Sequence, residues 1–237
     1  MARLGSYEVA KFAGFSRETI KFLQGLQEHN DKAWFDAHRA EYEEHYLEPA
    51  KAFVTALAPA LEKWRPGLHA EPRVNGSIFR INRDVRFSKD KTPYKHHLDL
   101  WFWEGEGRNF ACPGLFFRLL PGELIMGVGL HKLDKDWLRK YRAAILDDAT
   151  AKDLQKVLTK VEKAGYAIGG RNLARVPRGL PPDHPRADLL RHDGITATLE
   201  TPLPKDLYTA NFTKFCLGHF KAMLPLHTWL VELGSRK

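Results

Sequence analysis

The spacing of the apolar residues changes twice along this chain, and these changes restrict the folds that it can adopt. Between residues 16 and 64 the apolar residues follow a helical period, which begins after Ser16, a residue typical of a helix N-cap. Asn30 or Asp31 can cap a second helix, and Pro49 either interrupts that helix or opens a third. We therefore expect the chain to begin with a helical layer that needs another element to pack on.

Between residues 74 and 130 the period of the apolar residues becomes two, as in strands. Residues 77–87 alternate strictly and predict a strand, with one apolar face formed by Phe79, Ile81, Val85 and Phe87. Residues 96–103, HHLDLWFW, predict a second strand, and residues 114–130 predict a hairpin that turns at Pro-Gly. The links are too short for helical crossovers, so these strands should form an antiparallel meander.

The helical period returns over residues 134–164 and is followed by an irregular basic segment, residues 165–193, with a short helix after Pro185. Residues 194–234 predict one more strand, GITATLE, and then one or two C-terminal helices. No linker divides the chain. We therefore expect a single α+β domain over residues 1–237, in which an antiparallel sheet of about five strands packs against N-terminal, middle and C-terminal helices.

The net charge of +8 is concentrated in two segments. Residues 65–97 contain 8 Lys and Arg against 3 Asp and Glu, and residues 171–192 contain 5 against 2. If the two segments meet in space, they form a surface that faces an anion. The alternative is that water solvates both.

The chain shows neither a signal-peptide pattern nor an apolar run of the roughly 20 residues that a membrane-spanning helix requires. Its two cysteines, Cys112 and Cys216, lie far apart and form no CxxC pair. This usage suits a reducing compartment. We therefore expect a cytoplasmic protein with no membrane partner.

The segment from residue 80 to residue 95 offers the densest group of basic side chains. The alternation places Arg83 among apolar neighbours, where it must be paired, either with a carboxylate of the helical layer or with a ligand. Arg80, Asp84 and Arg86 would share the opposite strand face, where an Arg-Asp-Arg ladder is the structural alternative. Asp84 is a candidate general base or a group that orients a guanidinium.

The loop that follows, SKDKTPY, adds further cations and hydroxyl groups around a turn fixed by proline: Ser88, Lys89, Lys91, Thr92, Tyr94 and, directly after it, Lys95. Arginine forks together with lysines are what phosphate or carboxylate recognition requires. The segment lacks the glycines of a P-loop, and its spacing does not separate phosphate from carboxylate. We expect Arg80, Arg86 and Lys91 to hold an anion, with Arg83, Tyr94 and Lys95 beside them.

Residues 77–102, SIFRINRDVRFSKDKTPYKHHLDLWF, resemble an uncharacterised family of bacterial and fungal proteins catalogued as domain of unknown function twenty-four sixty-one. The family signature, Arg-x-x-Arg-Asp-x-Arg-Phe-Ser-x-Asp-Lys-x-Pro-Tyr-Lys, is matched from Arg80 to Lys95, with Asn82 where an aromatic residue is more usual. Further blocks resemble the family around Asn30, Trp34, Phe35 and Tyr42 and in residues 175–191. The resemblance implies that these segments form one unit, and it implies no activity, cofactor or catalytic residue.

The third block contributes Arg175 and Arg178, which we expect near the basic loop, and the pair Asp183-His184 within PPDHP. His184 is a candidate acid-base group, and the alternative is that the pair forms a turn. We expect no metal, because His38 and His45 are seven residues apart and His96 and His97 point to opposite faces of a strand. No GxSxG pattern is present, and Cys112 suits a core thiol.

Three functions follow from these features. The first is binding of a small anionic or phosphorylated ligand at the basic strand and loop, without a cofactor and with turnover left open. The second is binding of nucleic acid, since aromatic residues lie among the basic ones, although no RNP, KH or zinc-finger pattern is present. The third is a partner-binding or structural protein whose arginines form internal ion pairs. The sequence leaves the oligomeric state open.

Overall fold

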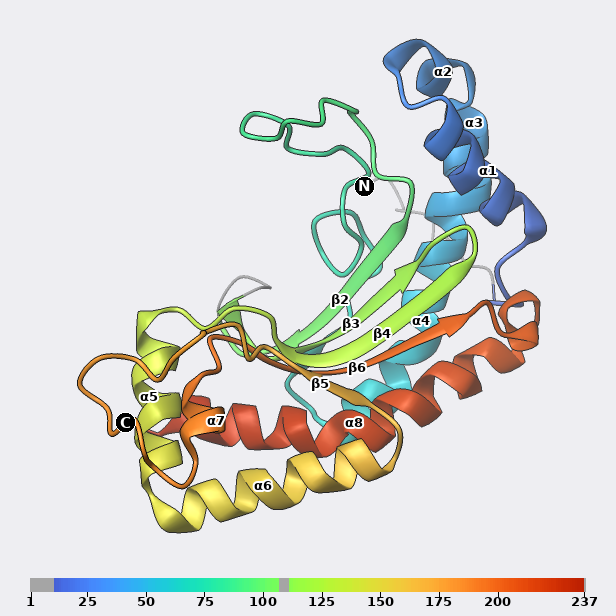
Figure 1. Ribbon diagram of the computed structural model, residues 1–237. Helices are drawn as coiled ribbons and strands as arrows, with labels where there is room; N and C mark the ends of the chain where they lie inside the picture. The colour runs from blue at the N-terminus through green and yellow to red at the C-terminus, as the bar shows by residue number, and fades with distance from the viewer. Residues whose placement is uncertain (1–10, 107–110, 237) are drawn as a thin grey trace, which may run out of the picture. The chain divides into compact units, whose positions relative to one another are not determined.

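The computed structural model describes residues 11–106 and 111–236 and shows a mixed α+β protein with one open antiparallel sheet (Figure 1). The described residues form two compact units. The first comprises the chain up to Leu100 with Arg118–Glu123 and Pro202–Phe215, and the second comprises Trp101–Phe117, Leu124–Thr201 and the chain from Cys216 onward. The α+β class agrees with the sequence, and the single domain stays a prediction.

The first unit begins with helices at the places where the helical period predicts them. Helix α1, Arg17–Glu28, starts with a capping box between Ser16 and Thr19, and α2, Lys32–Ala37, starts at Asp31, which accepts from the N–H of Trp34. A short helix α3, Arg39–Glu41, leads into a π-helical turn, η1, Tyr42–Leu47, and then into α4, Glu48–Trp64. Pro49 therefore lies in the first turn of α4, which agrees with the expectation that it opens a third helix.

The π-helical turn is anchored to the first helix by a side chain. The Thr19 hydroxyl donates a hydrogen bond of 2.6 Å to the carbonyl of His45, a group within the turn. Tyr46 also lies in the turn, is fully buried, and donates from its hydroxyl to the His97 carbonyl at 3.3 Å. The wider helical turn thus points an aromatic residue at the chain segment that precedes the central strands.

The sheet has six strands in the order β1-β2-β3-β4-β6-β5 (Figure 1). Its strands are β1 Leu68–His69, β2 Leu98–Glu104, β3 Gly114–Leu119, β4 Glu123–Leu130, β5 Ala167–Gly169 and β6 Ile195–Pro202. The predicted strand at HHLDLWFW, the Pro-Gly hairpin and the GITATLE strand are confirmed. The two short strands β1 and β5 were not predicted, because two or three residues show no period.

The second unit holds the helices expected after the hairpin. They are α5 Lys135–Leu146, α6 Asp148–Lys163, the short α7 Ala187–Leu190 after Pro185, and the part of α8, Asn211–Ser235, that starts at Cys216. The C-terminal segment forms one helix that contains Pro225. Within the described residues, no helix has both the length and the apolar composition needed to cross a membrane. Both cysteines are buried free thiols.

The prediction of a strand at residues 77–87 is wrong. This segment is a loop, linked to its surroundings by isolated bridges from Ile78 to Leu100 and from Asn82 to Tyr94 (Figure 1). Ile81 is buried as the alternation requires, but Phe87, which was expected on the apolar face, is 95% exposed. The alternation therefore ends near Ile81, and Arg80, Asp84 and Arg86 share no strand face.

Candidate functional site

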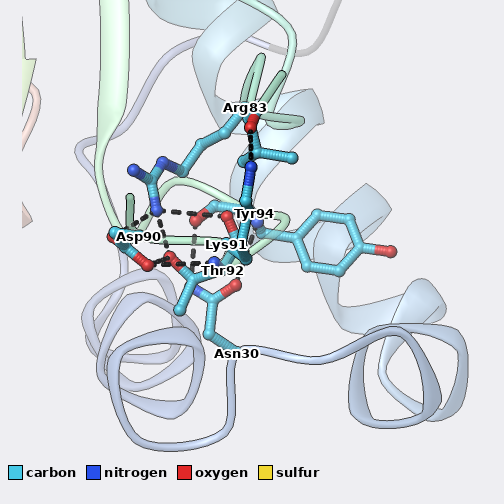
Figure 2. A network of polar contacts seen from close by, with 7 residues as sticks. Asn30, Arg83, Asp90, Lys91, Thr92 and Tyr94 are labelled. Atoms are coloured by element: carbon cyan, nitrogen blue, oxygen red, sulfur yellow. Dashed lines mark hydrogen bonds and ion pairs between the residues drawn. The ribbon is translucent and has the colours of Figure 1, made fainter. Parts of the chain in front are cut away.

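Arg83 is the centre of a polar network that braces the basic loop, as Figure 2 shows. Its guanidinium donates to the carboxylate of Asp90 and to both the hydroxyl and the carbonyl of Thr92, the carbonyl at 3.1 Å. Its backbone N–H donates to the Pro93 carbonyl at 2.8 Å. Arg83 is paired, as expected, but the carboxylate comes from the same loop and not from the helical layer, and a ligand as a further partner of Arg83 stays a prediction.

Arg86 and Asp84 form a second pair within this loop. The guanidinium donates to both carboxylate oxygens, from Nε at 2.9 Å and from Nη2 at 2.7 Å. These bonds lower the pKa of the Asp84 carboxyl to about 2. At neutral pH Asp84 is therefore an ionised partner of Arg86 and a poor proton acceptor, so its geometry favours the role of orienting a guanidinium. Lys91 donates to the Val85 carbonyl at 2.9 Å.

The returning leg of the loop is attached to the N-terminal helices through Tyr94. The Asn30 side chain accepts from the N–H of Tyr94 and donates to its carbonyl, both at 2.9 Å, much as a neighbouring strand would (Figure 2). The Tyr94 ring stacks on Phe35 of α2 with 4.2 Å between centroids. Tyr94 is thus a buried structural residue, and it fixes where Lys95 and the two histidines after it emerge.

Next to this leg, three basic side chains share one buried carboxylate. Asp99 lies in β2 with 4% of its side chain exposed, and Arg118 of β3 donates to both of its oxygens, at 2.7 and 3.0 Å. His97 Nε2 lies 3.2 Å from Asp99 Oδ2, and Lys95 Nζ lies 3.9 Å from the same oxygen. We call these four residues the Asp99 cluster.

The pKa values of the Asp99 cluster reflect both its burial and its ion pairs. Burial raises the pKa of the Asp99 carboxyl, but hydrogen bonds from His97 and Arg118 outweigh burial and leave it below its usual value. Burial lowers the pKa of Lys95, and repulsion from Arg118 and Arg80 acts in the same direction against the attraction of Asp99. Two cations of the cluster, Lys95 and Arg118, thus pair with the one carboxylate of Asp99.

A further histidine extends this basic environment. Burial lowers the pKa of His96, and the neighbouring His97, Arg83 and Arg118 lower it further. His96 consequently favours its neutral form, in which the imidazole can both donate and accept a hydrogen bond. The Lys95 ammonium also lies 4.7 Å from the centroid of the Phe79 ring, a cation-π contact that limits where its amino group can point.

The sequence did not single out Asp99 and Arg118 as a pair. Each stood as a charged residue inside an apolar strand, at positions 99 and 118. That is a usable signal, because a charge within a buried strand requires a partner. Choosing the partner requires the cross-strand register of β2 and β3, which the sequence does not supply.

The candidates of the third block belong to the second unit. Arg175, Arg178 and Asp183 are exposed, and the expectation that the two arginines join the basic loop stays a prediction. His184 accepts from the N–H of Arg186 at 3.1 Å, which closes its own turn and agrees with the turn-forming alternative.

The second unit also contains a groove of about 590 Å³ between α6, β5 and α7. Its lining includes the Arg171–Asp188 ion pair and the buried His192, and acidic and basic groups both line it. Over the described residues, no group of three or more His, Cys, Asp or Glu side chains has the arrangement of a metal site.

The model of a family described as conserved hypothetical protein (DUF2461) matches residues 18–229. No curated protein matches the chain.

Proposed function

Because the chain belongs to the DUF2461 family of conserved hypothetical proteins, whose description names no activity, we propose a function from the site itself: binding of a small anionic ligand at the Asp99 cluster. The ligand carries a phosphate or carboxylate group. Lys95 and Arg118 supply the positive charge, His97 supplies an imidazole, and Asp99 holds these groups in place.

The observation that carries this proposal is the sharing of one buried carboxylate among three basic side chains. Arg83 and Arg86 each have an acidic partner of their own, so their charges are matched one to one. Around Asp99 the Lys95 ammonium and the Arg118 guanidinium face a single carboxylate. An anion next to Lys95 balances the charge of its ammonium group and accepts hydrogen bonds from it.

The proposal changes the roles expected from the sequence. Arg80 stays near the ligand, because its charge acts on Lys95. Arg86 and Lys91, which were expected to hold the anion, shape the loop through Asp84 and the Val85 carbonyl. We also place this function in the cytoplasm, which the two free thiols support.

Titration of the protein with inorganic phosphate tests the proposal, with the melting temperature and calorimetry as readouts. Phosphate should stabilise the wild-type protein, since a ligand that binds only the folded state shifts unfolding. Lys95→Gln should weaken phosphate binding by roughly tenfold, about the effect of losing one charged hydrogen bond. Arg86→Ala is the matched control, because it removes an exposed arginine of the same segment and should leave phosphate binding unchanged.

Arg118→Gln provides a second variant, with a larger expected loss of phosphate affinity and some loss of stability. If Lys95→Gln and Arg118→Gln bind phosphate as the wild type does, or if Arg86→Ala alone abolishes binding, the ligand does not lie at the Asp99 cluster. Acetate in place of phosphate distinguishes a preference for carboxylate from a preference for phosphate.

A further inference from the structure

Phe87 stands at the tip of the basic loop with its ring in solvent. It is 95% exposed, whereas the next most exposed large apolar side chains of the described residues, Leu146 and Tyr208, are 41% and 37% exposed. An aromatic ring exposed to this degree gains nothing from the fold that carries it. It is therefore available to a partner.

The loop that presents Phe87, residues 84–92, is braced on both sides of the ring. Before it, the Arg86 guanidinium donates two hydrogen bonds to the Asp84 carboxylate. After it, the Arg83 guanidinium donates to Asp90 and to Thr92 (Figure 2). Across the loop, Ser88 N–H and Lys91 Nζ both donate to the Val85 carbonyl, at 3.3 and 2.9 Å. The ring is held out by a preorganised loop, so a partner need not order the loop as it binds.

The charges around the ring are mostly positive. Both carboxylates of the loop are occupied: hydrogen bonds from Arg86 lower the pKa of Asp84 to about 2, and hydrogen bonds from Thr92 and then Arg83 lower the pKa of Asp90 to about 2. Lys89 is exposed and, within the part of the chain that the structure describes, forms no ion pair or hydrogen bond. Arg80 and Lys91 are also exposed, so a partner that reaches Phe87 meets several cations.

We propose that residues 84–92 bind single-stranded nucleic acid, with one base stacked on the Phe87 ring and the adjoining phosphates near Lys89, Lys91 and Arg80. An exposed aromatic face surrounded by flexible cations is the chemistry by which proteins hold single strands without reading their sequence. Arg86 already lies 5.8 Å from the ring centroid, so the ring can carry a guanidinium on one side and a base on the other.

This inference does not rest on the proposed anion site. Phe87, Lys89 and Lys91 lie outside the Asp99 cluster, and Arg80 is common to both proposals. A protein pocket or an anionic lipid surface could also take up an apolar tip with cations beside it, but both would accept any apolar side chain of similar size. Stacking requires a π-face, and this difference decides between the partners.

The test measures binding of a fluorescent oligothymidylate of about ten nucleotides, by anisotropy at low salt. Phe87→Ala should weaken binding roughly 5- to 150-fold, the range expected for one lost stacking contact. Phe87→Leu should lose as much, and Phe87→Tyr should bind like the wild type. All three should melt as the wild type does, because the ring makes no packing contact that the fold needs.

Two further variants complete the test. Leu146→Ala removes another exposed apolar side chain and should leave oligonucleotide affinity unchanged. Lys89→Gln should reduce the slope of log K against log salt by about 0.7, the value for one phosphate contact with a single strand.

The proposal is overturned if the wild type does not bind the oligonucleotide at low salt, or if Phe87→Ala binds it equally well. It is also overturned if Phe87→Leu retains full affinity, since the ring then acts only as an apolar group. Binding to vesicles of anionic phospholipid that is equally strong for Phe and Leu at position 87, without oligonucleotide binding, identifies a lipid surface as the partner.

Discussion

Asp99 and Asp188 are two carboxylates that each serve several basic side chains, and they differ in burial. Asp99 has 4% of its side chain exposed and meets Arg118, His97 and Lys95. Asp188 has 73% exposed and meets Arg171 and Arg191, at 2.9 and 3.2 Å. Water screens the second group more strongly than the first, so the two groups should differ in their effect on stability.

The comparison also shows a difference between the two basic segments that their net charges do not reveal. Both segments carry an excess of arginine and lysine in the sequence. In the structure Lys95 and His97 of the first segment meet a buried acid, Asp99, whereas Arg171 and Arg191 of the second meet an exposed acid, Asp188. Burial, and not composition, separates a candidate binding site from a solvated surface.

The largest effect should come from Asp99→Asn. Removing the charge leaves Arg118 and Lys95 without their buried partner, and we expect a loss of about 3 kcal/mol in the free energy of unfolding, measured by denaturant. This lies at the low end for a broken buried pair, because the cations are partly exposed. A loss below about 1 kcal/mol would show that burial does not separate the two carboxylates.

A smaller loss is expected for Asn30→Ala, which removes two hydrogen bonds between neutral groups. The Tyr94 N–H and carbonyl lose their partners, at a cost of about 1–2 kcal/mol in the free energy of unfolding. Asn30→Asp is the control, since it keeps the acceptor for the Tyr94 N–H and should lose only part of that amount. If Asn30→Ala costs more than Asp99→Asn, hydrogen bonds rather than the buried ion pair determine the stability of this region.

Acid should remove the contribution that Asp99 makes to stability. The folded-state pKa of Asp99 is lowered, so the stability that Asp99 contributes is present above pH 4 and is lost as pH falls through the folded-state value. Wild type should therefore lose more stability than Asp99→Asn between about pH 5 and pH 2. Asp84 and Asp90 titrate in both proteins, so the difference reports Asp99. Parallel acid curves would contradict the prediction.

The smallest effect is expected for Asp188→Asn. Its pairs with Arg171 and Arg191 lie in solvent, and their loss should change the free energy of unfolding by about 0.5 kcal/mol or less. Added salt should have the same small effect on wild type and variant. A loss similar to that of Asp99→Asn would show that the exposed carboxylate is not screened.

The sequence predicted the elements that carry a long hydrophobic period and missed what depends on contacts between distant residues. Helices α1, α4, α5 and α6 and the Pro-Gly hairpin follow from local spacing. The prediction failed at residues 77–87, because apolar and basic residues also alternate in this loop. The backbone of Tyr94, farther along the loop, pairs with the Asn30 side chain and not with a neighbouring strand.

The candidate site was predicted in part for the same reason. Arg83 was expected to be paired, and its pairing with Asp90 is local. Asp99 and Arg118 are 19 residues apart and meet only through the register of neighbouring strands. Phe87 was assigned to an apolar face that does not exist, and its exposure follows from the loop network around Arg83.

The π-helical turn at Tyr42–Leu47 sets the direction in which the side chains of the following helix, α4, point. A π-helical turn inserts one residue into the α-helical ladder, so the side chains beyond it are rotated by about 100° relative to a regular helix. Deleting one residue there would restore the regular ladder and swing Tyr46 away from the His97 carbonyl. The extra residue of the π-helical turn thus determines which side chain of this segment reaches the His97 carbonyl.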